Sequence, residues 1–291
     1  MIRKWIATIF IFTFLFSTAS YAQQAGGYID LIDQSKKTVV FLGTQTPNGI
    51  MLHATGVLVN IQNVFFLITA KHVVMNPYTN QMTDNGMIVF FNLKNGQIGT
   101  RSIYEIKKRF SVDWIFHKDK HVDIAMLPFG LNPQTDDVKT IPDDLFLTAD
   151  KLYETYDVFF LSYQPGIEPE QKISPIIRKG AIALINDDKT FYIDGFAFPG
   201  NSGGPVFLKP SPIRYNETGI TIGGDPLGGK FIGIIGEYIT YEEIATSTQT
   251  GRPRISFEEN TGLSKVWSVT FIKEIIESDA FKQQLNKFIK K

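Results

Sequence analysis

Short apolar segments rich in β-branched and aromatic residues occur along most of the chain, and turn residues separate them. They fall into two sets of about six. The first set comprises residues 38–42, 56–61, 64–68, 87–92, 98–104 and 122–127. The second set comprises residues 157–162, 176–185, 191–193, 205–208, 231–239 and 263–267. Asn95-Gly96 is a strong hairpin signal inside the first set. Many short strands joined by glycine and proline turns predict an all-β protein built from barrels.

Four stretches depart from this strand pattern. Residues 131–151 are rich in Asp and Thr and predict a linker between the two sets. Residues 209–230 look like an insertion directly after the predicted strand 205–208. Residues 240–260 are polar and predict an exposed loop. In the tail, over residues 270–291, apolar residues recur with a period near 3.6. That period predicts an amphipathic helix, which we expect to pack on the second set rather than lie on a membrane.

The segment from Pro199 to Pro205 reads Pro-Gly-Asn-Ser-Gly-Gly-Pro and places Ser202 between glycines, directly before an apolar strand. Glycines allow backbone conformations that other residues resist. They leave the amides of Gly200 and Ser202 free to point at one oxygen atom. Two such donors beside a serine hydroxyl can hold the oxyanion that forms when the serine attacks a carbonyl group. Because a serine alone is a weak nucleophile, this interpretation requires a base and an orienting acid elsewhere.

The same segment fits the Gly-x-Ser-x-Gly elbow of α/β-hydrolases, in which the histidine follows the serine along the chain. The four histidines are His53, His72, His117 and His121, and all of them precede Ser202. The order therefore excludes an elbow with a downstream histidine.

His72 and Asp123 are the candidate base and orienting acid. His72 follows the predicted strand 64–68, which pairs with 56–61 in a hairpin. Asp123 opens a short apolar strand, so its carboxylate is partly buried and needs a partner. An imidazole N–H is such a partner, and this bond fixes the tautomer that a general base requires.

A metal site is the competing interpretation of this region. His117, His121 and Asp123 have a spacing that resembles a set of metal ligands. The glutamate base of the zinc-protease motif is missing, and the segment has the pattern of a loop followed by a strand rather than a helix. We therefore predict no metal. His53 is expected to be a surface or hydrogen-bonded histidine.

The N-terminal 22 residues have the pattern of a secretory signal peptide: Arg3 and Lys4 precede the apolar run 5–16, and small residues end at Ala22. An uncleaved membrane anchor is the alternative. Removing this leader leaves 27 basic against 29 acidic residues, so no basic surplus attracts nucleic acid. The chain has no cysteine, and an exported protein of this kind relies on its core rather than on disulfides. We predict a periplasmic or secreted protein.

The segments "TGVLV", "FLITAKHVV", "HVDIAMLPF" and "PGNSGGPVF" together resemble the trypsin/chymotrypsin-type serine proteases, whose catalytic residues follow the order histidine, aspartate, serine. Asparagine before the serine and the run "NTGLSKVWSVTFIKEII" resemble the bacterial Deg-type (high-temperature-requirement) branch. No PDZ-like segment is recognised after the protease region, and Lys71 replaces the alanine usual before the histidine. The resemblance implies two six-stranded antiparallel β-barrels and a C-terminal amphipathic helix. The implied organisation is a signal peptide (1–22), an N-terminal barrel (23–130), a linker (131–151), a C-terminal barrel (152–269) and a helix (270–291).

The resemblance implies a serine endopeptidase that needs no cofactor. Ser202 is the expected nucleophile, His72 the base and Asp123 the orienting acid, while the Gly200 and Ser202 amides form the oxyanion hole. Counting back from the serine places Phe196 near the base of the primary specificity pocket, where no acid is available to select Lys or Arg.

The expected partner is a protein or peptide substrate, with no nucleic acid and no stable membrane span after leader removal. Asn201 is neutral and cannot pair with a freshly cut N-terminal ammonium, so activation by such a cut is not expected. Two alternatives remain open: a protease-fold binding or chaperone-like protein with little turnover, and an esterase.

Overall fold

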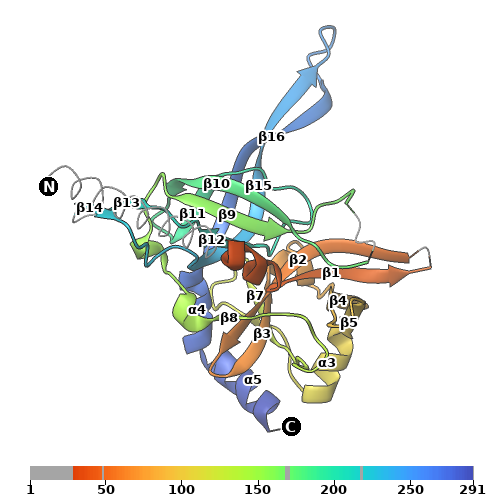
Figure 1. Cartoon of the computed structure of the whole chain (residues 1–291). Helices are drawn as coiled ribbons and strands as arrows, with labels where there is room; N and C mark the ends of the chain where they lie inside the picture. Colours follow the sequence, from red (N-terminus) through yellow and green to blue (C-terminus); the bar gives the residue numbers. More distant parts are fainter. Residues whose placement is uncertain (1–28, 48, 168–170, 217–218, 291) are drawn as a thin grey trace, which may run out of the picture.

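A computed structural model of the chain describes residues 29–290, except residues 48, 168–170 and 217–218. The predicted signal peptide lies outside the described residues. Residues 29–36 form a short helix, and the rest of the described chain is mostly β-structure in two sheets that pack side by side (Figure 1). None of the helices in this part of the chain is both long and apolar enough to cross a membrane.

The N-terminal half forms an eight-stranded sheet with the order β5-β4-β1-β2-β3-β7-β6, and β8 pairs with β2. Its strands are β1 (Val39–Thr46), β2 (Gly49–Ile61), β3 (Val64–Thr69), β4 (Met87–Asn92), β5 (Ile98–Ser102), β6 (Ile115–Phe116), β7 (Ala125–Pro128) and β8 (Ile141–Pro142). Two helices interrupt them, α2 (Lys71–Val74) and α3 (Ile103–Phe110).

This sheet differs from the predicted six-stranded barrel. In the described part of the chain no pairing joins β5 to β6, so the sheet is not closed. The two terminal strands explain this: β5 runs directly into α3, which Ser102 caps by accepting the Glu105 amide, and β6 is two residues long. The predicted linker is also not a simple connection. It contains β8, which pairs in parallel with β2, and two short 3₁₀ helices (Asp143–Leu145 and Ala149–Lys151).

The C-terminal half is a closed antiparallel six-stranded barrel with the order β10-β11-β16-β15-β12-β9, as predicted. Its strands are β9 (Asp157–Ser162), β10 (Ile176–Ile185), β11 (Thr190–Asp194), β12 (Pro205–Leu208), β15 (Phe231–Thr246) and β16 (Pro253–Ser268). Alternate side chains such as Phe160, Ile193 and Val206 point into one core and are fully buried. The residues between them, such as Phe159, Leu161 and Phe207, are buried in a second core shared with the N-terminal sheet. Because both faces of these strands are buried, they appear in the sequence as continuous apolar runs.

Residues 240–260 differ from the predicted loop. They are the outer halves of β15 and β16, paired as a two-stranded hairpin that projects far beyond the barrel (Figure 1). We call this hairpin the arm. Its sequence contains Tyr241, Ile244, Ile255 and Phe257, which have high strand propensity, between the polar residues that suggested a loop.

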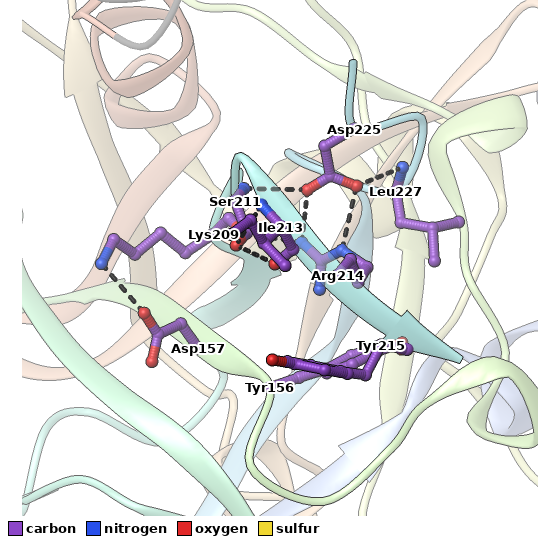
Figure 2. A network of polar contacts seen from close by, with 9 residues as sticks. All are labelled: Tyr156, Asp157, Lys209, Ser211, Ile213, Arg214, Tyr215, Asp225 and Leu227. Carbon is purple, nitrogen blue, oxygen red and sulfur yellow. Dashed lines mark hydrogen bonds and ion pairs between the residues drawn. The ribbon is translucent and has the colours of Figure 1, made fainter. Parts of the chain in front are cut away.

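The predicted insertion folds as a second hairpin, β13 (Ile213–Asn216) with β14 (Gly219–Ile222). Figure 2 shows how its inner face is held: the Arg214 guanidinium forms two hydrogen bonds with the Asp225 carboxylate and lies 4.6 Å from the centre of the Tyr156 ring. Asp225 also accepts the backbone amides of Ser211 and Leu227. Burial opposes ionisation of Asp225, but the hydrogen bonds and charge of Arg214 outweigh it and lower its pKa below the ordinary value. The buried ion pair therefore holds the insertion together internally, and the contacts with Tyr156, just before β9, connect it to the barrel.

The tail forms two helices instead of the single predicted one: α4 (Val269–Glu277) and α5 (Asp279–Ile289). Ser278 separates them because its backbone is extended and its hydroxyl accepts the Phe281 amide, which starts the second helix. Helix α4 packs on β15 and β16 of the barrel, whereas α5 contacts β6 and β7. The Phe281 ring stacks on Phe66 at 5.0 Å, so the tail packs against both sheets.

Candidate active site

His72 lies just after β3, in the short helix α2, and faces Asp123 on the segment before β7. The imidazole Nδ1 is 2.7 Å from Asp123 Oδ2. The backbone N–H of His72 donates to the other carboxylate oxygen at 2.8 Å. This two-point contact fixes the orientation of the ring and leaves its Nε2 pointing away from the carboxylate.

Ser202 reaches the same ring from the barrel, on the turn that precedes β12. Its Oγ lies 3.0 Å from His72 Nε2 and 3.1 Å from the backbone carbonyl oxygen of Gly236 on β15. Along the chain, His72 is 51 positions from Asp123 and 130 positions from Ser202. The structure thus brings the three predicted residues together. His72 and Asp123 come from the N-terminal sheet and Ser202 from the barrel, so the site lies between the two halves.

The protonation of His72 is set by opposing effects. Burial lowers its pKa, but the hydrogen bond and the charge of Asp123, together with the charge of Glu237, outweigh burial and raise the pKa above its ordinary value. The neutral imidazole can accept a proton from Ser202, and Asp123 stabilises the imidazolium that results.

The turn before Ser202 has a defined geometry. The Asn201 amide donates to the Phe198 carbonyl at 2.9 Å, Pro199 is the second residue of the turn, and Gly200 is the third with φ of +94°. This is the pattern of a type II turn, which needs glycine at the third position. Within the described residues, neither the Gly200 amide nor the Ser202 amide donates a hydrogen bond. Both remain available to a ligand beside the serine.

Gly203 shows why the motif requires glycine after the serine. Its φ is +84°, and a Cβ atom at this position would lie 2.2 Å from the Thr55 carbonyl oxygen and 2.4 Å from Thr69 Oγ1. Such distances are far below van der Waals contact, and both neighbours lie in the sheet that carries His72. Any larger residue would push the Ser202 turn away from His72.

Thr55 is a site residue that the sequence analysis missed. It is fully buried in β2 and connects the N-terminal sheet to the serine turn. Its hydroxyl donates to the Gly200 carbonyl at 2.8 Å and accepts the Tyr163 amide at 2.9 Å, and its amide donates to the Ser202 carbonyl at 3.0 Å. A threonine inside an apolar strand was the only sequence signal for this role. Gly236 and Glu237 gave no signal, because their positions depend on how β15 packs.

Asn201 is also fully buried. Its side-chain oxygen accepts the Phe198 amide at 2.9 Å, and its side-chain nitrogen donates to the Tyr163 carbonyl. Both halves of the amide are therefore used within the barrel. The turn is supported by neutral hydrogen bonds, without a carboxylate that would need a cationic partner.

A cavity of about 430 Å³ opens beside Ser202. Its walls include Ala197, Phe198, Gly236, Glu237 and Tyr238, and it also touches His53 at its rim. No residue of the described parts of the 209–230 insertion contributes to this cavity. The hairpin that the insertion forms leaves the serine open on this side.

Phe196 does not line this cavity, contrary to the prediction that placed it in the specificity pocket. Its ring is about half exposed, faces Gly262 and borders a separate pocket with Arg178 and Lys179. The neighbouring residue is held the other way, because Ala197 bonds to Ser264 through its amide and to Asn260 through its carbonyl. Adjacent side chains on an extended segment point to opposite sides, so Phe196 points outward.

The remaining histidines are not members of the triad. His117 bonds through Nε2 to Glu274 at 2.8 Å and accepts the Asp119 amide through Nδ1, so both ring nitrogens are engaged. His121 donates its backbone amide to Asp119 Oδ1 at 2.9 Å. In the part of the chain that the structure describes, no three potential metal-ligating side chains converge. His53 bonds to Thr44, in agreement with its expected role as a hydrogen-bonded histidine.

The sequence from residue 54 to 210 matches the family model of the trypsin-like peptidase domain, and this range covers more than half of the chain. The chain belongs to the trypsin-like peptidase family. The match includes His72, Asp123 and Ser202 and ends before the arm. It confirms the resemblance to the trypsin/chymotrypsin-type serine proteases. No curated protein shows significant similarity to this trypsin-like peptidase.

Proposed function

We propose that the protein is a serine endopeptidase with His72, Asp123 and Ser202 as its triad. The observation that carries the proposal is the unbroken contact from Asp123 through His72 to Ser202, at 2.7 and 3.0 Å, beside an open cavity. These separations are hydrogen-bonding distances for a nucleophile and its base. Membership of the trypsin-like peptidase family supports the same chemistry.

In the proposed reaction, Ser202 Oγ attacks the carbonyl carbon of the scissile peptide bond while His72 Nε2 takes the hydroxyl proton. The Gly200 and Ser202 amides stabilise the oxyanion. The C–N bond then breaks as His72 returns the proton to the leaving amine, which leaves an acyl group on Ser202. A water molecule, deprotonated by His72, hydrolyses this ester and regenerates the serine.

We also propose that the protein acts outside the cytoplasm, after removal of residues 1–22, and that it belongs to the Deg-like branch of the family. The pattern of the leader and the absence of cysteine support the first proposal. The asparagine before the serine supports the second. We further propose the domain boundaries 1–22, 23–130, 131–151, 152–269 and 270–291, with an open sheet in place of the first barrel and two helices in place of the single C-terminal one.

The test is to label the purified protein with a fluorophosphonate and to measure cleavage of fluorescein-labelled casein. Ser202→Ala should prevent labelling and lower kcat by about a million-fold, as in measured triads, without changing the circular dichroism spectrum. Labelling without turnover on casein and peptides would instead support a binding or chaperone-like protein. Turnover of esters alone would support an esterase.

A further inference from the structure

The arm continues the strand that forms the wall of the active-site cavity. Gly236, Glu237 and Tyr238 on β15 line the cavity, and the eight residues 239–246 carry the same strand outward into the arm. At about 3.3 Å per residue, these eight residues extend about 26 Å beyond the cavity. A peptide held beside Ser202 therefore meets the arm if it remains extended.

One edge of this strand is open. The backbone of Ile235 bonds to Gly203 and Gly204, and pairing with β12 goes no further along β15 than this point. From Gly236 to Thr246, β15 pairs only with β16 among the described residues. The open edge lies on the side of the cavity, because the Gly236 carbonyl accepts the Ser202 hydroxyl.

The arm by itself is an incomplete sheet. A two-stranded hairpin is at best marginally stable in water, and a third strand is needed for a stable unit. Natural edge strands usually avoid further pairing by carrying proline or lysine. The edge from Tyr238 to Thr246 contains neither, and apart from Glu242 and Glu243 it consists mainly of β-branched and aromatic residues.

The two faces of the arm present both apolar and acidic side chains. The cross-strand pairs place Tyr241, Ile255 and Phe257 on one face, each more than half exposed. On the other face Glu242 lies directly opposite Glu258, an arrangement that like charges make unfavourable.

Two further glutamates, Glu243 and Glu259, lie on the apolar face and are exposed. Within the described residues none of the four arm glutamates forms an ion pair. A cationic partner would relieve the repulsion, whereas the arm of a second copy brings four glutamates against only two arginines, Arg252 and Arg254.

We propose that the arm is an extended binding site for the part of a peptide substrate N-terminal to the cleaved bond, and that it selects segments with Lys or Arg among apolar residues. The peptide adds a third strand to the open edge of β15 by antiparallel pairing. Antiparallel pairing places the residues nearest the cleaved bond at Gly236 and more distant upstream residues along 239–246. This inference rests on the proposed peptidase function and adds its substrate class.

The experiment compares two quenched fluorescent peptides taken from the main casein cleavage site. One has three residues upstream of the cleaved bond. The other has ten, and its additional upstream residues are designed to include two lysines and two leucines. For the unmodified protein, kcat/KM for the long peptide should exceed that for the short one by about tenfold, a factor that corresponds to about 1.4 kcal/mol. Replacing both lysines of the long peptide with glutamate should remove most of this advantage.

Two variants locate the effect. Replacing residues 242–258 with an Asn-Gly turn, which closes the hairpin at Tyr241 and Glu259, should bring the two kcat/KM values together. Glu242→Gln with Glu258→Gln keeps the arm folded and should lower the preference for the lysine peptide three- to tenfold. Ile220→Ser, on the exposed face of the other hairpin, is the matched control and should keep the full preference.

Equal kcat/KM values for the short and long peptides in the unmodified protein would overturn the proposal. A preference for the long peptide that survives both arm variants would also overturn it. A change from oligomer to monomer when the arm is shortened would do the same, because the arm would then be a subunit contact. If no peptide is cleaved and Ser202 is not labelled, the proposed function fails. Binding of the long peptide to Ser202→Ala, measured by fluorescence anisotropy with and without the arm, still decides the inference.

Discussion

The hydroxyl of Thr55 offers a sharp test of how the two halves hold the serine turn. Thr55→Val keeps the shape of the side chain but removes the donor to the Gly200 carbonyl and the acceptor of the Tyr163 amide. Both bonds are buried, and each lost bond of this kind costs about 1–3 kcal/mol. Removing the buried hydroxyl itself recovers part of this loss, so we expect the free energy of unfolding to fall by about 2–4 kcal/mol.

The substitution should also affect catalysis, because the Gly200 carbonyl and the Asn201 amide belong to one peptide group in the turn that carries the oxyanion donors. Loss of one oxyanion donor lowers kcat by about 10²–10³-fold, and we expect Thr55→Val to reduce kcat by no more than this. KM should change less than kcat, since Thr55 is fully buried and does not line the cavity.

The assay is urea denaturation in the Ser202→Ala background, which prevents self-cleavage, together with kcat and KM in the active protein. Thr55→Ser keeps the hydroxyl and is the matched control, with an expected loss in stability below that of the valine variant. A valine variant that unfolds within about 0.5 kcal/mol of the unmodified protein and keeps its kcat would refute the bridging role of Thr55.

Three further predictions concern the site. Asp123→Asn should preserve the fold and lower kcat by roughly ten-thousand-fold, because the amide favours the wrong imidazole tautomer; full activity of this variant would refute the triad assignment. The raised pKa of His72 should place the acid limb of the kcat/KM profile above the pKa of a free histidine, with activity lost as the pH falls through it. Glu237→Gln should move that limb to lower pH, and an unchanged limb would contradict the effect of its charge. Asn201→Asp should destabilise the fold by about 3–5 kcal/mol, measured by urea denaturation, because the substitution places a buried carboxylate oxygen against the Tyr163 carbonyl oxygen.

The sequence determined the features that depend on local pattern. Continuous apolar runs located the inner strands of the barrel, because strands such as β9 and β12 are buried on both faces. The glycines around Ser202 and the order of His72, Asp123 and Ser202 indicated the catalytic chemistry, because each role requires a particular side chain. The apolar period of the tail predicted helix, but the capping serine at 278 divided that helix in two.

Only the tertiary structure decided which residues meet across the two sheets. Thr55 bonds to a turn 145 positions away, and no local pattern encodes such a pair. The sheet of the N-terminal half stays open because β5 runs directly into α3 and β6 is only two residues long. The outward direction of Phe196 depends on bonds from Ala197 to Ser264 and Asn260. The sequence of the arm predicted a loop because both faces of the arm are in solvent, so burial imposed no apolar alternation on it. Only the pairing of β15 with β16 makes this segment a hairpin.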